Sequence, residues 1–400
     1  MRPIDVVIPV YRGHDQTRRC IESVLAARQS APTNVVVIDD ATPEPAIAAY
    51  LDEVARSGRL TLLRNAANLG FVRSVNRGMA LNPGHDVVLL NSDTEVANDW
   101  LDRLRASAYR EANIATVTPF SNNATICSYP FEGWDGRIPG TLGLAALDAI
   151  FARANAGKAV DIPTAVGFCM FIRRDCLERL GAFDAERFGR GYGEENDFCM
   201  RAGKAGWRNV LAADVFVFHE GAVSFSEERA ALTHAAGHTL IAIHPEYPAK
   251  VHEFVRNDPA APLRSAVDLA RVEAGTEEAK HVVAERLDER TRLVAGLWEI
   301  DKLAETVRER QSVIGQLDRA LEHASELVAE RDRVIAAERA LFAGRAEEVA
   351  KLSAGLAYAE KLAFERADEL ERIQSFWLWR AFSFLRNRVF SGSRKASGAS

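Results

Sequence analysis

An acidic cluster that directly follows an apolar run is the clearest chemical feature of the sequence. Residues 87–90 are all apolar and lead into residues 91–95, which read Asn-Ser-Asp-Thr-Glu. A short unbroken apolar run is typical of a strand buried on both faces of a parallel sheet. Ligands of open α/β sheets bind at the carboxyl ends of the strands, where Asp93 could hold a hard divalent cation that carries phosphate oxygens. The alternative is a strand that ends in a polar turn.

The strands and helices that would position this acid alternate regularly. Strand-like apolar runs occur at 4–10, 34–38, 60–63 and 87–90, and helical stretches follow them at 16–28, 45–56, 71–80 and 100–111. This alternation predicts an α/β fold, a Rossmann-like and mostly parallel sheet with helices on both faces. Because each predicted strand ends in polar or turn residues, those residues would meet at one edge of the sheet.

Composition and missing motifs disfavour several classes of protein. The formal net charge of −6 and the pI near 5.9 argue against general binding to nucleic acid. The first strand–helix turn lacks GxGxxG and the chain lacks GxxxxGKS/T, which disfavours dinucleotide-binding and P-loop enzymes. Five cysteines without a CxxC pair favour a reduced, cytosolic protein. We expect no signal peptide and no membrane span, since the first strand starts near Met1 and no run of about 18 apolar residues exists.

Five stretches, taken in order, resemble the family 2 nucleotide-sugar glycosyltransferases. They are PVYRGHDQTRRCIESVL, VVVIDDAT, NLGFVRSVNRGM, VVLLNSDTEV and GYGEENDFCMRAGKAGWRNVLAADVFVFHEG, and they span roughly residues 3–245. The resemblance implies a GT-A fold, an activated sugar nucleotide as donor and inversion at the anomeric carbon. LLNSDTEV in particular resembles rhamnosyltransferase-like members, which implies a dTDP- or UDP-linked donor.

The resemblance also implies a nucleotide site. Asp39 matches the acid that accepts a hydrogen bond from the imide N–H of uracil or thymine, with a turn or helix-capping acid as the alternative. Gly70 lies in the segment beside the nucleotide, although it could simply permit a tight turn. The matched nucleotide-binding positions are Pro9, Val10, Tyr11, Asp39, Asn68, Gly70, Asn76, Asn91 and Ser92.

The resemblance assigns a divalent cation, Mg²⁺ or Mn²⁺, to Asp93 and His219. Asn91-Ser92-Asp93 matches the family's DxD motif, but Asn91 stands where the motif usually starts with Asp, so Asp93 is the one carboxylate assigned to the metal. His219 follows the apolar run 215–218, where similar enzymes complete the metal site with a histidine. The alternative is a histidine that packs or lies at the surface.

The catalytic base is assigned to the acidic stretch 191–198. Glu195 falls where the family's base usually stands, and Asp197 and Glu194 are the alternatives. An inverting transfer needs one carboxylate to take the proton of the acceptor hydroxyl as that oxygen attacks the anomeric carbon. The structural alternative is the charged first turn of a helix over 195–205, which the helix macrodipole would favour.

A long stretch between the two acidic motifs is rich in Asn, Gly, Pro and aromatic residues. It covers residues 121–163, and Tyr129 and Trp134 are candidates to stack on an acceptor sugar. A plain surface connection is the alternative.

The last third of the chain differs in composition. Pro245, Pro248, Pro259 and Pro262 punctuate a predicted linker, and every seventh residue from 300 to 370 is apolar. This repeat predicts a long coiled coil, which could join two copies of the chain. Polar residues in the matching second column leave a helical hairpin, or a helix that lies on the transferase domain, as alternatives.

The end of the chain, residues 376–390, is aromatic, basic and amphipathic. That combination is typical of a helix that lies in a membrane interface, and docking on protein is the rival. The predicted parts are a transferase domain (1–245), a linker (246–285), a coiled coil (286–373), an interfacial helix (374–391) and a disordered tail (392–400).

These features predict a cytoplasmic enzyme, peripheral on the inner face of the membrane. It would move a sugar from a nucleoside-diphosphate donor to a hydroxyl of a glycan or lipid-linked glycan in bacterial surface polysaccharide assembly. A coiled-coil scaffold with a degenerate transferase domain is the alternative, and Asn91 is its support. A nucleotidyltransferase is disfavoured because no glycine-rich basic loop lies near the start of the chain.

Overall fold

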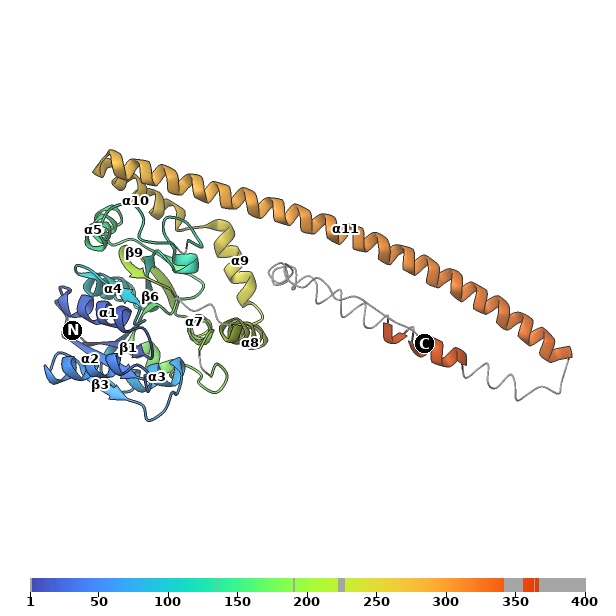
Figure 1. Cartoon of the computed structure of the whole chain (residues 1–400), viewed down its shortest axis with the longest axis horizontal. Helices are drawn as coiled ribbons and strands as arrows, with labels where there is room; N and C mark the ends of the chain where they lie inside the picture. The colour runs from blue at the N-terminus through green and yellow to red at the C-terminus, as the bar shows by residue number, and fades with distance from the viewer. Residues whose placement is uncertain are drawn as a thin grey trace, which may run out of the picture. The chain divides into compact units, whose positions relative to one another are not determined.

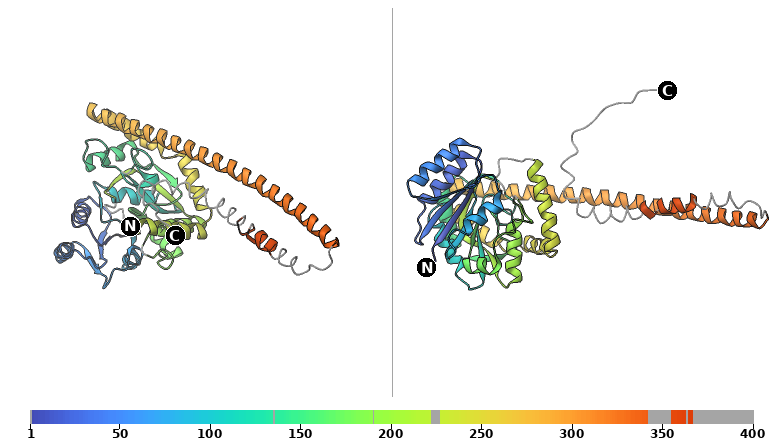
Figure 2. Two further views of the ribbon diagram at one scale, coloured as in Figure 1. Left: turned by 45° about the vertical axis from the view of Figure 1, so that its right-hand side comes forward. Right: turned by 90° about the horizontal axis from the view of Figure 1, so that it is seen from below.

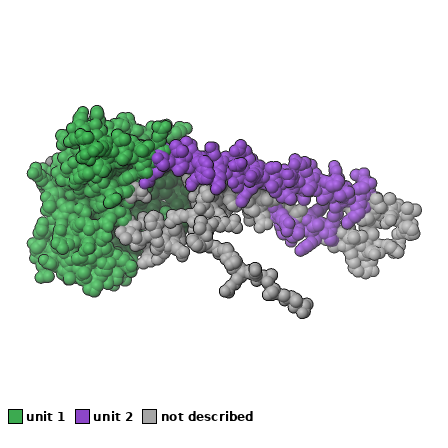
Figure 3. Space-filling view, turned by 45° about the horizontal axis from the view of Figure 1, so that its top comes forward, with its two compact units in different colours: residues 1–290 green, residues 291–400 purple. Residues whose placement is uncertain are grey.

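The computed structural model of the chain describes residues 2–134, 136–189, 191–221, 227–341, 355–362 and 364–366. It contains two compact units, residues 1–290 and residues 291–400, which Figure 3 draws in different colours. The candidate site lies in the first unit.

A mixed β-sheet organises the first unit (Figure 1). Its strands are β1 (Ile4–Val10), β2 (Thr33–Asp39), β3 (Thr61–Arg64), β4 (Asp86–Leu90), β5 (Thr94–Glu95), β6 (Ile114–Ser121), β7 (Ala159–Ile162), β8 (Cys169–Ile172) and β9 (Arg208–His219). They follow the order β3-β2-β1-β4-β8-β6-β9-β5, and β7 pairs with β9. β1 to β4 pair in parallel, whereas β8 runs antiparallel to both of its neighbours.

Helices cover both faces of this sheet, which confirms the predicted α/β fold. The helices are α1 (His14–Ala26), α2 (Pro45–Arg56), α3 (Phe71–Met79), α4 (Trp100–Ala108), α5 (Leu144–Ala154), α6 (Arg174–Leu180), α7 (Glu194–Lys204), α8 (Glu227–Ile243), α9 (Tyr247–Asn257), α10 (Ala261–Ala274) and α11 (Thr276–Leu341). One apolar cluster includes residues of α1, α2, α4, α5 and α10, and a second includes residues of α3, α6, α7 and α8.

The side chains of β1 show how the sequence builds these two layers. Val6 and Ile8 belong to the first apolar cluster and Val7 to the second, because successive side chains of a strand point to opposite faces. Gly78 of α3 lets that helix approach the sheet, since a methyl group there would collide with the side chain of Val7. The continuous apolar runs of the strands therefore reflect burial on both faces.

Residues 246–285 are not the predicted linker. They form α9, α10 and the first turns of α11, and Phe254, Leu263 and Val267 are buried in the first apolar cluster. Pro248 and Pro262 lie in the first turns of α9 and α10. Proline at that place begins a helix instead of breaking one, because its missing N–H would have no partner within the helix.

In the second unit α11 continues as one helix to Leu341, and Figure 2 shows it unbroken in two further views. Ile300, Val307 and Leu321 of the predicted apolar column are at least half exposed on this helix. Pairing with a second copy stays a prediction. The predicted interfacial helix (374–391) and disordered tail (392–400) lie outside the described residues. None of the helices in the described part of the chain combines the length and the hydropathy that a membrane span requires.

Candidate active site

The carboxyl ends of β1 and β2 are joined by backbone and side-chain hydrogen bonds. Asp40 N donates to Val10 O at 2.9 Å, and Thr42 Oγ1 donates to Tyr11 O at 2.7 Å. Val10 is buried in the apolar cluster, so only its backbone faces this edge, whereas the ring of Tyr11 is 38% exposed. Of the predicted Pro9–Val10–Tyr11 contact surface, the partly exposed Pro9 and the exposed Tyr11 are the parts that a nucleobase could reach.

Asp39, the predicted base-reading acid, also has a structural role. Its Oδ1 accepts a hydrogen bond from Thr42 N at 2.8 Å, and its Oδ2 accepts one from Arg64 Nε at 3.1 Å. Each carboxylate oxygen accepts more than one hydrogen bond, so these contacts orient the side chain and leave it acceptor capacity.

Asp40 is a residue that the sequence analysis missed. This buried carboxylate accepts hydrogen bonds from Leu69 N at 2.7 Å, Gly70 N at 2.9 Å and Asn65 Nδ2 at 2.7 Å. Gly70 has φ +82°, a conformation that side chains rarely adopt, and Asn68 Oδ1 also accepts from Gly70 N. Asp40 therefore shapes the loop that was predicted to lie beside the nucleotide. In the sequence, the feature that could have indicated this role is the position of Asp40 as the second aspartate of VVVIDDAT.

Asn76, another predicted nucleotide contact, binds the protein's own backbone. Its Nδ2 donates to Phe183 O at 2.8 Å, and its Oδ1 accepts from Phe183 N at 3.1 Å. This two-way pairing joins α3 to the loop after α6. The structure thus gives Asn76 a scaffold role, which sequence spacing alone could not distinguish from ligand binding.

Asp93 and His219 are brought together although they are 126 residues apart in the chain. Thr94 of β5 pairs with His219 of β9, and His219 Nε2 lies 3.5 Å from Asp93 Oδ1. His219 Nδ1 donates to Asn123 O at 2.6 Å, and the ring stacks on Phe168 with centroids 5.2 Å apart. A neutral histidine that donates through Nδ1 has its lone pair on Nε2, which here faces the Asp93 carboxylate.

The donor set fits a hard divalent cation that is shared with a ligand. Across the described ranges, no group of three or more His, Cys, Asp or Glu residues could hold a metal ion. The pair would supply one carboxylate oxygen and one imidazole nitrogen, and phosphate oxygens and water would complete the shell. Thr94 N and Oγ1 both donate to Asn91 O, at 3.3 and 2.7 Å, so Asn91 and Ser92 form the turn that presents Asp93.

Glu195 and Glu194 begin α7 after Gly193, which has φ +94°. Glu195 Oε2 accepts from Gly193 N at 3.2 Å, and burial raises the pKa of the Glu195 carboxyl above its ordinary value. Glu194 is buried, its Oε2 has no hydrogen-bond partner, and burial followed by repulsion from Glu195 raises its pKa well above the ordinary value. Repulsion between the two neighbouring carboxylates therefore disfavours the state in which both are ionised.

Asp197, the first alternative base, is engaged elsewhere. Its Oδ2 accepts from Arg201 Nε at 2.8 Å, and its Oδ1 contacts His244 Nε2 at 2.8 Å. Its side chain is only 6% exposed. Asp197 therefore joins α7 to His244, which follows α8, and it is more buried than Glu195.

Two consecutive residues connect the acidic turn with the Asp93–His219 pair. A methyl group on Gly167 would lie 3.7 Å from Cδ of Glu195, and Phe168, the next residue, stacks on His219. The backbone of Phe168 also accepts from Asn91 N at 2.8 Å. The short segment before β8 therefore brings both predicted chemical centres to one edge of the sheet.

The predicted acceptor-stacking role of Tyr129 is wrong. Tyr129 is fully buried, and its hydroxyl donates to Asp268 Oδ1 at 2.7 Å and accepts from Arg271 Nη1 at 2.9 Å. A ring enclosed in this way cannot stack on a sugar. Trp134 is partly exposed and stays a candidate.

An α/β sheet therefore presents the Asp93–His219 pair and the Glu194–Glu195 turn at one edge. Residues 5–181 match the model of the family described as Glycosyl transferase family 2.

Two curated relatives are glycosyltransferases by name. The chain is 26% identical over 263 residues to an N-acetylglucosaminyl-diphospho-decaprenol L-rhamnosyltransferase of Mycobacterium tuberculosis, covering 59% of this chain and 81% of that protein. It is 25% identical over 189 residues to N-acetylgalactosaminyltransferase 7 of Drosophila melanogaster, covering 43% of this chain and 31% of that protein. Among solved structures, it is similar to a mannosyltransferase from Pyrobaculum calidifontis in complex with GDP-Man and Mn²⁺. The two are 18% identical with a TM-score of 0.46, and the similarity covers 72% of this chain and 80% of that one.

Proposed function

We propose that the protein is an inverting, metal-dependent glycosyltransferase. It would move a sugar from a dTDP- or UDP-linked donor to a hydroxyl of a glycan or lipid-linked glycan acceptor in bacterial surface polysaccharide assembly. The observation that carries the proposal is the approach of His219 Nε2 to Asp93 Oδ1 at 3.5 Å, with His219 Nδ1 held by Asn123 O. The relative whose name gives both sugar and acceptor transfers L-rhamnose to a lipid-linked N-acetylglucosamine.

Each residue then has a defined task. Asp93 and His219 would hold a divalent cation, which when bound neutralises charge on the departing diphosphate. Asp39 would accept from the base, and Tyr11 would pack against it. Glu195 would take the proton of the acceptor hydroxyl as the new glycosidic bond forms on the face of the sugar opposite the diphosphate. Its raised pKa suits this task, because a base whose pKa is nearer the working pH binds the proton more strongly.

The proposal is tested by screening sugar nucleotides. Thermal unfolding of the full chain would be followed with dTDP-, UDP- and GDP-sugars, each with and without Mn²⁺, and hits would be assayed for turnover. A stabilisation by one nucleotide class that requires both metal and Asp93 is the expected result. Equal shifts in wild type and Asp93→Asn would contradict the metal assignment.

A scaffold with an inactive transferase domain is the second candidate, and Asn91 favours it. The DxD motif that residues 91–93 resemble usually starts with Asp, and here that position carries the amide of Asn91. The arrangement of Asp93, His219 and Glu195 argues for activity. If no sugar nucleotide changes the unfolding temperature with or without metal, the scaffold becomes the better interpretation.

We further propose that the enzyme works at the cytoplasmic face of the membrane, held there by residues 376–390. Support for this placement comes from the aromatic and basic amphipathic pattern of that segment. The relative's lipid-linked acceptor would suit such a position.

A further inference from the structure

Two buried arginines on α10 bind the loop that precedes α5. Arg264 and Arg271 have side chains only 2% and 0% exposed. Burying a guanidinium is costly unless most of its donors are satisfied, so the partners of these two side chains indicate what they hold in place.

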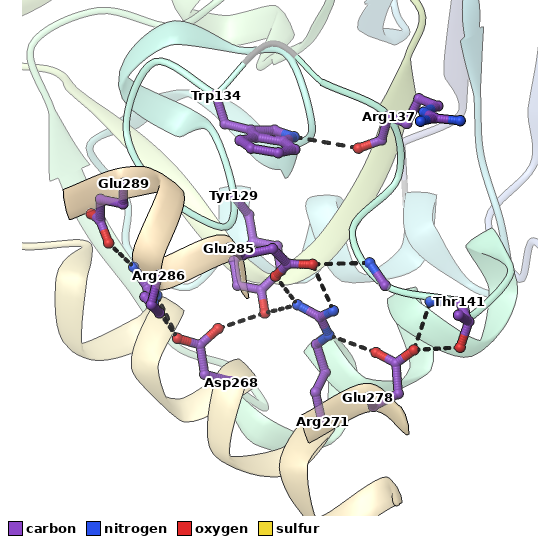
Figure 4. Close-up of polar contacts among 11 residues, drawn as sticks. Tyr129, Trp134, Arg137, Thr141, Asp268, Arg271, Glu278, Glu285, Arg286 and Glu289 are labelled. Carbon is purple, nitrogen blue, oxygen red and sulfur yellow. Dashed lines mark hydrogen bonds and ion pairs between the residues drawn. The ribbon is translucent and has the colours of Figure 1, made fainter. Parts of the chain in front are cut away.

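Arg271 is the centre of a hydrogen-bond network that contacts the loop at Tyr129 directly and at two further residues through glutamates (Figure 4). Its Nη1 donates to Tyr129 Oη at 2.9 Å and to Glu285 Oε2 at 2.6 Å, and its Nε donates to Glu278 Oε2 at 3.0 Å. The two glutamates, on the first turns of α11, in turn accept from the loop backbone. Thr141 N donates to Glu278 Oε1 at 2.7 Å, and Gly140 N donates to Glu285 Oε1 at 3.0 Å.

Arg264 holds the middle of the same loop through backbone carbonyls. Its Nε donates to Ser128 O at 2.9 Å and its Nη2 to Ile126 O at 3.1 Å, while Nη1 pairs with Asp258. A planar guanidinium can bind two carbonyl oxygens in fixed directions, which a lysine ammonium does less well.

The start of the loop positions His219. Asn122 pairs with the histidine's backbone in both directions, since His219 N donates to Asn122 Oδ1 at 2.9 Å and Asn122 Nδ2 donates to His219 O at 2.8 Å. Asn122 Nδ2 also donates to Gly136 O at 2.8 Å, and Asn123 O accepts from His219 Nδ1. The backbone carbonyl that orients the imidazole therefore belongs to a loop that α10 and α11 hold.

We propose that Arg264 and Arg271 are positioning residues for the Asp93–His219 centre, acting through the loop 121–141 that both of them contact. The inference rests on the proposed function. If it holds, the part of the chain that the transferase activity requires is larger than the family match at 5–181 and includes α10 and the first turns of α11. Outer partners of a metal-binding histidine set its tautomer and orientation, and their loss costs about 10- to 100-fold in metal affinity.

The test compares Arg264→Lys/Arg271→Lys and the milder Tyr129→Phe with wild type in the full chain. Arg286→Lys is the matched control, because Arg286 joins the same two helices through Asp268 and Glu289 without a bond to the loop. The first readout is ¹⁵N NMR of histidine-labelled protein at fixed pH, with the His219 signal assigned by His219→Asn. The second is the Mn²⁺ concentration that gives half-maximal turnover.

Wild type and Arg286→Lys should show His219 as the Nδ1–H tautomer, and the double lysine variant should show a mixture. The half-maximal Mn²⁺ concentration should rise about 10-fold in that variant, with kcat at saturating metal changed less than about 3-fold. An unchanged tautomer and Mn²⁺ dependence in folded variants would overturn the inference. If the double variant does not fold, Tyr129→Phe decides by the same readouts. A tautomer shift in a protein whose wild type needs no metal would overturn the proposed function and leave the positioning role standing.

Discussion

The two acidic regions of the site differ in what surrounds their carboxylates. Asp93 keeps 26% of its side-chain surface exposed and faces His219, so a ligand could reach its carboxylate. The acids of α7 are more enclosed. Asp197 is paired with Arg201 and His244, and Glu194 is buried without a partner for Oε2. Glu195 is half-buried and accepts a hydrogen bond from Gly193 N. The comparison shows that carboxylates of one site can differ in burial, which raises the pKa values of the enclosed glutamates and leaves Asp93 accessible.

The largest effect should follow from neutralising the half-buried acid of α7. Glu195→Gln should lower turnover by about 10²- to 10⁴-fold with donor binding nearly intact, because only the proton acceptor is lost. Steady-state kinetics and donor titration measure this. Asp197→Asn is the comparison variant, expected to unfold more easily and to keep its turnover per folded molecule. Near-normal turnover in Glu195→Gln together with a dead Asp197→Asn would reverse the roles assigned to the two acids.

The next effect concerns the exposed acid. Asp93→Ala should weaken metal-dependent donor binding by about 10²-fold, since it removes the one carboxylate of the donor set. Calorimetric titration of the sugar nucleotide with and without Mn²⁺ measures it. Glu95→Ala is the matched control, because Glu95 lies two residues further on and pairs with Arg19. Full wild-type activity in excess EDTA would transfer phosphate neutralisation to basic side chains.

A smaller effect, on stability, tests the buried acid of α7. The pKa of Glu194 is raised in the folded protein, so its contribution is fully present below the pKa of the unfolded chain and is lost as pH rises through the folded pKa. Over that window wild type should lose up to about 1.4 kcal/mol per pH unit from this group. Glu194→Gln should lack this loss, and chemical denaturation from about pH 5 to 9 would show it. Parallel curves would mean that Glu194 is not protonated in the folded state.

The smallest effect on catalysis should come from removing the chain after Arg372. The truncated protein should act normally on a soluble acceptor analogue, because the acids of both regions remain. It should bind anionic vesicles less well, since each basic residue contributes about 1 kcal/mol near such a surface. Co-sedimentation with liposomes at low salt measures this. Equal partitioning of both proteins, or binding by neither, would contradict the membrane role.

Local sequence patterns predicted much of the fold, and the resemblance to family motifs supplied the hypothesis that Asp93 and His219 lie together. The strand at Ile4–Val10 and the helix at Pro45–Arg56 have the predicted bounds, because apolar runs and a first-turn proline act over a few residues. The resemblance of LLNSDTEV and FHEG to family motifs directed attention to Asp93 and His219, which the structure places 3.5 Å apart.

Contacts between distant residues decided the rest. Asp197 was an alternative base in the sequence, and in the fold one of its oxygens contacts His244, which lies 47 positions later. Asn76 resembled a nucleotide ligand, yet its amide binds Phe183, 107 positions away. Tyr129 was predicted to stack on a sugar, but it is buried against α10. Pro248 and Pro262 were predicted to lie in a linker, but they lie in the first turns of two packed helices. The type of a residue determines what it can bind. Which partner it contacts depends on its burial and on which distant segments lie beside it, and these are set only when remote parts of the chain pack together.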